Sequence, residues 1–332
     1  MTLYLMLAIG IAFAYIDGVH DGSTIIATTI SSRLLPPRQA IFLAGLSNFA
    51  GAVVMGTAVA MTVARGLVDA DKIIASGSDS ACTLIIAAFA ASIIWNIATW
   101  ITKLPSSASH SMLGALLGST LAALGSKAIY WDSFMIKVVA AMLISPIMGF
   151  IIGYLILHLE QAMLSNATMI WKGRISLLHK ISTILLAFSY GSNDSQKVMG
   201  LLAIGVAASS SSPIKVPMWL AVSCSLALAI GTMTGGRNMV YTVGKNITKI
   251  DLDNSFSSQL ASILVVATAN LTGIPISATQ VVTASVMGVG TEVTPKAVNW
   301  SAARNILIAW IVTIPASALL GGLTYELIAI AI

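Results

Sequence analysis

The feature that most constrains this chain is a polar, charged stretch inside a long apolar run. Residues 181–208 are largely apolar, yet Ser189–Lys197 places Asp194 and Lys197 three positions apart within them. A charge at the centre of a membrane helix costs roughly 2.5–3.5 kcal/mol, so a charge kept there indicates an ion or substrate path. Only 9% of the residues are charged and 57% are hydrophobic, whereas a soluble domain carries about 25% charged residues. We therefore predict an all-α polytopic membrane protein.

The overall charge and the motif content limit the partners. A formal net charge of +5 suits loops that face anionic lipid, so we expect membrane lipid as a partner. The sequence has no basic cluster with interleaved aromatic residues, and a nucleic acid partner is not expected. It also lacks a nucleophile–base–acid set with suitable spacing and a Walker pattern. We therefore expect no enzyme activity, and no cofactor apart from a coupling ion such as sodium.

The apolar segments divide the chain into two halves. Five segments are expected in each half, near 3–30, 39–64, 81–104, 106–126 and 134–158, and near 181–206, 214–236, 257–273, 276–290 and 299–330. Segments 106–126 and 276–290 begin at proline–serine turns and read as half-helices or re-entrant hairpins, because a full span needs about 20 residues. We predict a first repeat over 1–158, a cytoplasmic connecting loop over 159–180 and a second repeat over 181–332.

Two motifs recur at nearly the same spacing. Asp21 and Asp194 lie 173 positions apart (194 − 21), and Pro105 and Pro275 lie 170 apart (275 − 105). Such a match indicates an internal duplication. An odd number of crossings in each repeat turns the second repeat upside down, so broken helices of two inverted repeats would meet at the membrane midplane.

Loop charges give an orientation. When the connections are assigned alternately to the two sides, ten Lys and Arg residues fall on one side and five on the other. The richer side holds Arg33, Arg38, Lys103, Lys172, Arg174, Lys180, Arg237, Lys245, Lys249 and Lys296, and the poorer side holds Arg65, Lys72, Lys127, Lys137 and Lys215. The positive-inside rule makes the richer side cytoplasmic, with both termini outside the cell (inner) membrane.

The two proline turns are the candidate anion site. Each is followed by hydroxyl residues, which cap helix starts, and a helix start offers free N–H groups and partial positive charge to an anion. The substrate-binding candidates are Ser106, Ser107, Ser109, Ser277, Thr279, Gln280 and Gln196. Alternatively, these hydroxyls bond within their own helix or to a neighbouring helix, as is common in membrane bundles.

The acidic residues are the candidate cation site. Asp21 and Asp194 are expected to hold a coupling cation, with sodium as a candidate metal, because carboxylate, amide and hydroxyl oxygens suit hard cations. The other candidates are Asn193, Thr24, Lys197 and His20. Alternatively, each Asp is a buried, hydrogen-bonded group at a helix break. We expect Gly18, Gly22 and Gly191 to let the backbone unwind there. Asp17 has no assigned role beyond a cap at the membrane edge.

These motifs together resemble the inorganic phosphate transporter (PiT) family, over nearly the whole chain. The matching stretches are Gly18–Asp21, Gly191–Asp194, Pro105–His110 and Pro275–Gln280. The resemblance implies phosphate uptake driven by sodium or protons, often by a homodimer, and some relatives carry sulfate. The chain departs from the family pattern at Asp17, His20, Lys197 and Gln280.

The expected function is that of a secondary active transporter that takes up inorganic phosphate by symport with sodium or protons. A sulfate or other oxyanion permease and a passive anion channel are the alternatives. Lys197 replaces a neutral Asn of the family pattern, so it is expected either to act as a built-in cation near Asp194 or to extend to the membrane interface without a role.

Overall fold

The computed structural model describes the chain apart from residues 103–105, 165–168, 236–246, 249 and 332. The described residues form helices and no β-strand. The described α-helices are α1 (Thr2–Ser31), α2 (Pro37–Val54), α3 (Ala58–Gly66), α4 (Ala70–Ala75), α5 (Ser78–Ile101), α6 (Ala108–Leu124), α7 (Trp131–Phe134), α8 (Ala141–Leu164), α9 (Met169–Ser210), α10 (Met218–Thr234), α12 (Leu252–Thr272), α13 (Ala278–Val293) and α14 (Trp300–Ala331). A π-helical turn, Met135–Ala140, joins α7 to α8. The predicted all-α fold is confirmed.

Several helices have the length and composition of membrane spans. Among the described residues, four helical stretches qualify: α1, α5, Trp131–Met163 and α14. The pair α2 and α3 makes a fifth if it is counted as one span that bends by 65°. Gly56 lies in this bend with a φ of +82°, a conformation that favours glycine. The expected single segment over 39–64 is therefore broken in two.

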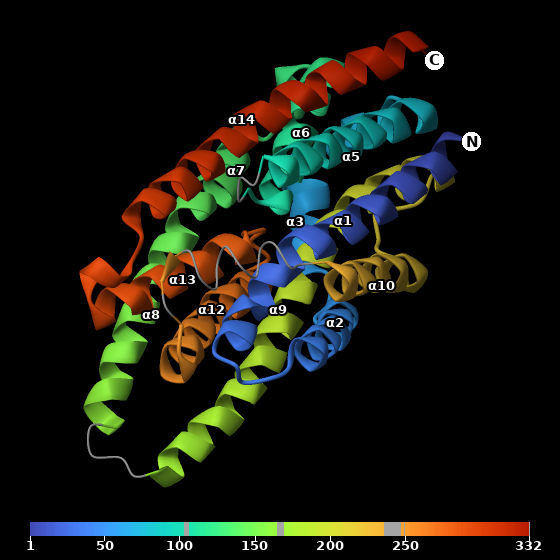
Figure 1. The fold of residues 1–332 in the computed structure, drawn as a ribbon. Helices are drawn as coiled ribbons and strands as arrows, with labels where there is room; N and C mark the ends of the chain where they lie inside the picture. The colour runs from blue at the N-terminus through green and yellow to red at the C-terminus, as the bar shows by residue number, and fades with distance from the viewer. Residues whose placement is uncertain (103–105, 165–168, 236–246, 249, 332) are drawn as a thin grey trace.

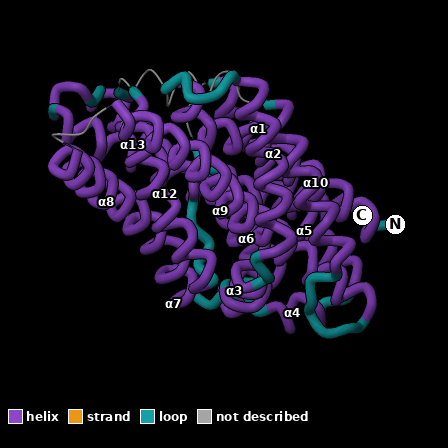
Figure 2. The backbone as a smooth tube through the Cα atoms, turned by 90° about the horizontal axis from the view of Figure 1, so that it is seen from below, coloured by secondary structure: helices purple, strands orange, loops and turns teal. Residues whose placement is uncertain are grey.

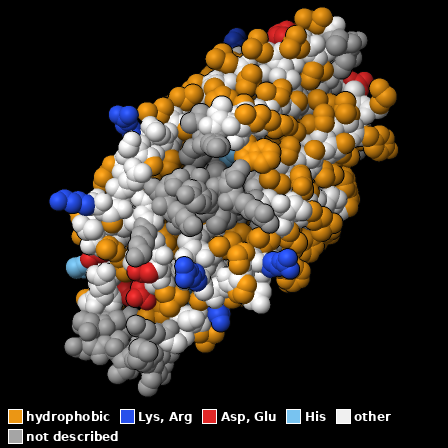
Figure 3. All heavy atoms as spheres, in the orientation of Figure 1, with side chains coloured by type: hydrophobic (Ala, Val, Ile, Leu, Met, Phe, Trp, Pro, Cys, Tyr) orange, Lys and Arg blue, Asp and Glu red, His pale blue; other side chains and the backbone are white. Residues whose placement is uncertain are grey.

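The outer surface also fits a membrane. Large hydrophobic side chains stand exposed along the outer helices, and hydrophobic atoms cover much of the face in Figure 3. The exposed set includes Ile147 and Leu155 of α8 and Leu319, Leu323 and Leu327 of α14. Exposed apolar surface of this extent indicates contact with lipid rather than with water.

Two helices are short and begin inside the molecule. Helix α6 has 17 residues and α13 has 16, and they start directly after Ser107 and Ser277. Their first turns are buried. The expected half-length helices at the two turns are thus present, although Pro105 lies outside the described residues.

The expected unwinding at glycines is wrong. Helices α1 and α9 run without interruption through Gly18, Gly22 and Gly191. These glycines instead allow close packing: a Cβ at Gly18 would collide with the Leu228 carbonyl of α10, and one at Gly191 with the backbone of Asn48 in α2. Small residues let membrane helices approach closely, and that packing explains their presence.

The stretch expected as a connecting loop is mostly helical. Helix α8 continues to Leu164 and α9 begins at Met169, so helices extend into both ends of 159–180. Figure 1 places the last turns of α8 and the first turns of α9 at one end of the molecule and both chain termini at the other, and Figure 2 again shows the termini together. The two termini therefore share one end of the molecule.

The helices pack in pairs, and the main pairs correspond to one another. The most extensive contacts join α1 to α10 and α2 to α9, and likewise α6 to α14 and α13 to α8. Helix α5 packs on α1, α6 and α14, while α12 packs on α9, α13 and α8. Each of these contacts thus has a counterpart when α1, α2, α5, α6 and α8 are matched in order with α9, α10, α12, α13 and α14.

Candidate functional site

The starts of helices α6 and α13 form one part of the candidate site. The Ser107 Oγ accepts a hydrogen bond from the His110 N–H (3.3 Å), and the Ser277 Oγ accepts one from the Gln280 N–H (3.4 Å). Both are N-caps with the same spacing. The helix starts meet directly, because the Gln280 Nε2 lies 3.1 Å from the His110 Nδ1. Two positive helix ends therefore converge in a buried place, which is an arrangement suited to an anion.

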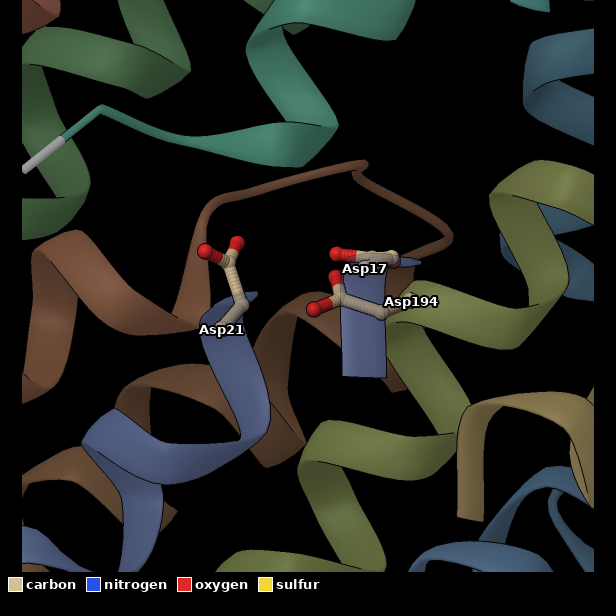
Figure 4. Close-up of side chains that lie close together, drawn as sticks. All are labelled: Asp17, Asp21 and Asp194. Carbon is tan, nitrogen blue, oxygen red and sulfur yellow. The ribbon is translucent and has the colours of Figure 1, made fainter. Parts of the chain in front are cut away.

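Three acidic side chains lie beside these helix starts. Asp17 and Asp21 come from α1 and Asp194 from α9, and one carboxylate oxygen of each lies within 4.8 Å of the others. Figure 4 shows Asp17 and Asp194 extending their oxygens toward the side where Asp21 stands. All three are 1% exposed. Three ionised carboxylates this close and this buried repel one another strongly unless cations or protons compensate them.

The acids and the start of α6 are directly linked. The Ala108 N–H donates to the Asp21 Oδ2 (3.3 Å), and the Ser109 hydroxyl donates to the Asp194 Oδ1 (3.0 Å). The His20 Nδ1 lies 2.8 Å from the Asp21 Oδ1. The candidate anion site and the candidate cation site are therefore one continuous polar centre.

Lys197 lies inside this centre and does not reach the membrane surface. Its side chain is 1% exposed. Its ammonium donates to the Asp194 carboxylate, to the Ser109 Oγ (2.8 Å) and to the Ile276 carbonyl (2.6 Å). The alternative that Lys197 extends to the membrane interface is therefore wrong, because its charge is held between α9, α6 and the turn before α13.

Several buried oxygen atoms of α1 and α9 have no hydrogen-bond partner among the described residues. They include Asp17 Oδ1 and Thr24 Oγ1 of α1, and Asn193 Oδ1, Asp194 Oδ2 and Ser195 Oγ of α9. Buried polar atoms are nearly always satisfied, so a group of unpartnered ones calls for an explanation. Carboxylate, amide and hydroxyl oxygens are the ligands that hard cations prefer, so the donor set fits sodium.

Some predicted site residues are engaged elsewhere. The Gln196 Oε1 accepts from the Val59 and Ala60 N–H groups (2.9 and 3.3 Å), so its amide caps the start of α3. The Ser106 hydroxyl donates to Thr99 of α5 (2.9 Å). Thr279 shares a hydrogen bond with Ser277 (2.9 Å) and stays at the start of α13. The structure thus brings Ser107, Ser109, Ser277, Thr279 and Gln280 together at the two helix starts.

A sequence model of the phosphate transporter family matches residues 17–321. The chain belongs to the phosphate transporter family. As a member of this family with several apolar helices, it is an integral multi-pass membrane protein, and the family's members are transporters rather than enzymes.

Relatives of this family member align over nearly its full length. A protein of Bacillus subtilis named "Probable low-affinity inorganic phosphate transporter" is 33% identical over 324 residues, which are 97% of this chain and 95% of that protein. A protein of the same name from Rhizobium meliloti is 33% identical, with 96% and 94% covered. A solved structure described as "The sodium-dependent phosphate transporter" matches with a TM-score of 0.88 at 21% identity, covering 100% of both chains. This last likeness shows the shared fold.

Two residues at the polar centre of this transporter are not predicted as ligands by the sequence: Asp17 is expected only as a cap at the membrane edge, and Asn270 is not singled out. Asp17 is the third acid, and its signal was its position four residues before Asp21, which puts both on one face of a helix. Asn270 accepts from the Asn193 Nδ2 (2.7 Å) and donates to the Ser189 carbonyl (2.9 Å), which fixes the amide of Asn193. Nothing in the sequence near Asn270 indicates this contact, because it depends on how α12 packs against α9.

Proposed function

We propose that this transporter takes up inorganic phosphate by symport with a cation, either sodium or a proton. The observation that carries the proposal is the junction of three buried acids with two converging helix starts. The names of the relatives supply the substrate, since two are described as inorganic phosphate transporters, and the solved relative is described as sodium-dependent.

The anion would lie between the starts of α6 and α13. Each helix end carries about half a positive charge, and its first N–H groups have no partner within the helix. Ser107, Ser109, Ser277 and Thr279 add hydroxyls, and Gln280 adds an amide. A tetrahedral oxyanion would receive hydrogen bonds from both helix starts, so both repeats would contribute to one site.

The charge balance would provide the coupling. Three carboxylates meet the single ammonium of Lys197, and phosphate adds roughly one to two negative charges. Uncompensated charge is very costly in a buried site. Cations at Asp17, Asp21 and Asp194, with Asn193 and Thr24 as further ligands, would therefore favour phosphate binding. Protons on the acids, or on His20, would serve the same purpose.

The transport cycle would follow from the duplication. The corresponding helix pairs support two repeats, 1–158 and 181–332, that meet at the polar centre. We propose that the repeats are inverted and that one bundle rocks against the other to expose the centre to either side in turn. We also propose that both termini lie outside the cell (inner) membrane, as the distribution of loop charges predicts. The homodimer that the family resemblance implies is part of the same proposal.

The test is uptake of labelled phosphate into proteoliposomes, with the sodium gradient and the pH gradient imposed separately. Accumulation of phosphate above the external concentration under one of these gradients supports symport. Flux that only equalises the two concentrations would instead identify a passive channel. Sulfate added as a competitor distinguishes a phosphate carrier, whose uptake persists, from a general oxyanion permease, whose uptake falls.

A further inference from the structure

The hydrogen-bond partners around Lys197 match the donors of a charged amine. Its three neighbours are an Asp194 carboxylate oxygen, the Ser109 Oγ and the Ile276 carbonyl. The Ser109 hydroxyl already gives its hydrogen to Asp194, so toward Lys197 it can only accept. As an ammonium, Lys197 has three donors, so it satisfies all three oxygens and forms an ion pair with Asp194.

The three atoms that hold Lys197 are also a cation-binding set. One is a carboxylate oxygen, one a hydroxyl oxygen and one a backbone carbonyl oxygen, which are the oxygen types that bind hard cations. They come from three parts of the chain: α9, the first turn of α6 and the turn that precedes α13. A bare metal ion would satisfy the same oxygens, so the ammonium stands where a cation ligand sphere exists.

We propose that the ammonium of Lys197 permanently fills one cation position of the polar centre, so that each transport cycle carries one cation fewer than the acids alone would require. This inference rests on the proposed symport. The ammonium is covalently attached, so it stays with the protein while phosphate and the mobile cations leave. Lys197 thereby sets the ratio of cations to phosphate.

The position of Lys197 relative to the other charged groups supports its role as a fixed cation. Asp17, Asp21 and Asp194 lie together, and His20 contacts Asp21 on the side of α1, whereas His110 contacts Gln280 at the helix starts. Among the described residues in this centre, Lys197 is the one lysine or arginine. Because it bridges the start of α6 and the turn before α13, it lies between the acids and both helix starts.

The experiment counts the charge that moves with phosphate. In proteoliposomes with a fixed phosphate gradient and equal cation concentrations on both sides, the membrane voltage at which net phosphate flux stops reports the net charge that moves with each phosphate. This count is the same whether the cation is sodium or a proton. We expect Lys197→Gln to move one more positive charge per phosphate than the parent. The matched control, Lys215→Gln, changes an exposed lysine and keeps the parent's count.

A second pair of variants tests the inference even if Lys197→Gln does not fold. Asp194→Asn removes one acid and is expected to move one positive charge fewer than the parent. Adding Lys197→Gln to it restores the parent's count, because one negative and one positive charge are then lost together. If Lys197 only holds the helices in place, Asp194→Asn and the double variant share one count, and the inference is overturned. If the parent itself shows no cation-driven uptake, the proposed symport fails instead.

Discussion

The cap residue Ser107 offers a way to separate binding from folding. Its Oγ accepts from the His110 N–H, and no described residue accepts its hydrogen. Ser107→Ala loses both the cap and the hydrogen that could reach phosphate, whereas Ser107→Gly keeps most of the cap energy. Replacing an N-cap serine by alanine costs about 1 kcal/mol of stability, and replacing it by glycine only a few tenths.

The expected loss of affinity follows from the bond to a charged group. Such a hydrogen bond contributes about 1.5–3 kcal/mol. At 1.4 kcal/mol for each factor of ten, Ser107→Gly is expected to weaken phosphate binding about 10- to 140-fold. Ser277→Gly is expected to do the same at the other helix start. The midpoint of thermal unfolding should change little in both glycine variants.

The assay is competition binding of labelled phosphate to purified protein, beside thermal unfolding in the same detergent. Asp251→Gly is the matched control, because Asp251 caps α12 through the Asn254 N–H (3.0 Å) and is exposed. It should leave phosphate affinity unchanged. Parent-like affinity in both Ser107→Gly and Ser277→Gly would refute the idea that the anion lies between the two caps.

Three further predictions concern packing, buried polarity and orientation. Gly191→Ala places a methyl group against the Asn48 backbone and is expected to lower the free energy of unfolding by about 1–3 kcal/mol. The control, Gly173→Ala on the same helix, places its methyl group in open space and should leave the stability unchanged. Thermal unfolding of the two variants and the parent checks this. Gln259→Leu should lower the midpoint of thermal unfolding, because each buried polar group left without a partner costs about 1–3 kcal/mol. The Gln259 amide forms hydrogen bonds with four hydroxyls, those of Thr28 (3.0 Å), Thr29 (2.7 Å), Ser182 (2.6 Å) and Thr183 (3.2 Å). An unchanged midpoint would contradict a stabilising role for these four hydrogen bonds. Single cysteines at Arg33 and Lys172 should be protected from an impermeant thiol reagent added outside, while one at Asp71 should react; labelling at 172 from outside would contradict the expected orientation.

The positions of the two helix starts and of two of the acids could be predicted from the sequence. Proline with a serine two residues later, repeated at a spacing of 170, is a local signal for a capped helix start, and α6 and α13 begin as expected. Asp21 and Asp194 stand out because charge is rare in apolar segments. These signals are local or depend on spacing, so one sequence is enough to read them.

The remaining features depend on contacts between distant segments. Gln196 has the residue type of a substrate ligand, yet the packing of α3 against α9 uses its amide as a cap. Gly191 has the residue type of a helix break, yet its neighbour is the backbone of Asn48, and the helix continues. A glycine or an amide serves either role equally well, and only the tertiary contact decides between them.

The most direct test of the central claim is the mutual dependence of phosphate and cation binding in the purified protein. If the acids and the helix starts form one centre, the coupling cation tightens phosphate binding, and phosphate tightens cation binding by the same factor, since the coupling free energy is reciprocal. We expect equal factors from the two titrations, and a smaller factor in Asp17→Asn. Phosphate affinity that is the same at all sodium concentrations and at all pH values would contradict the account.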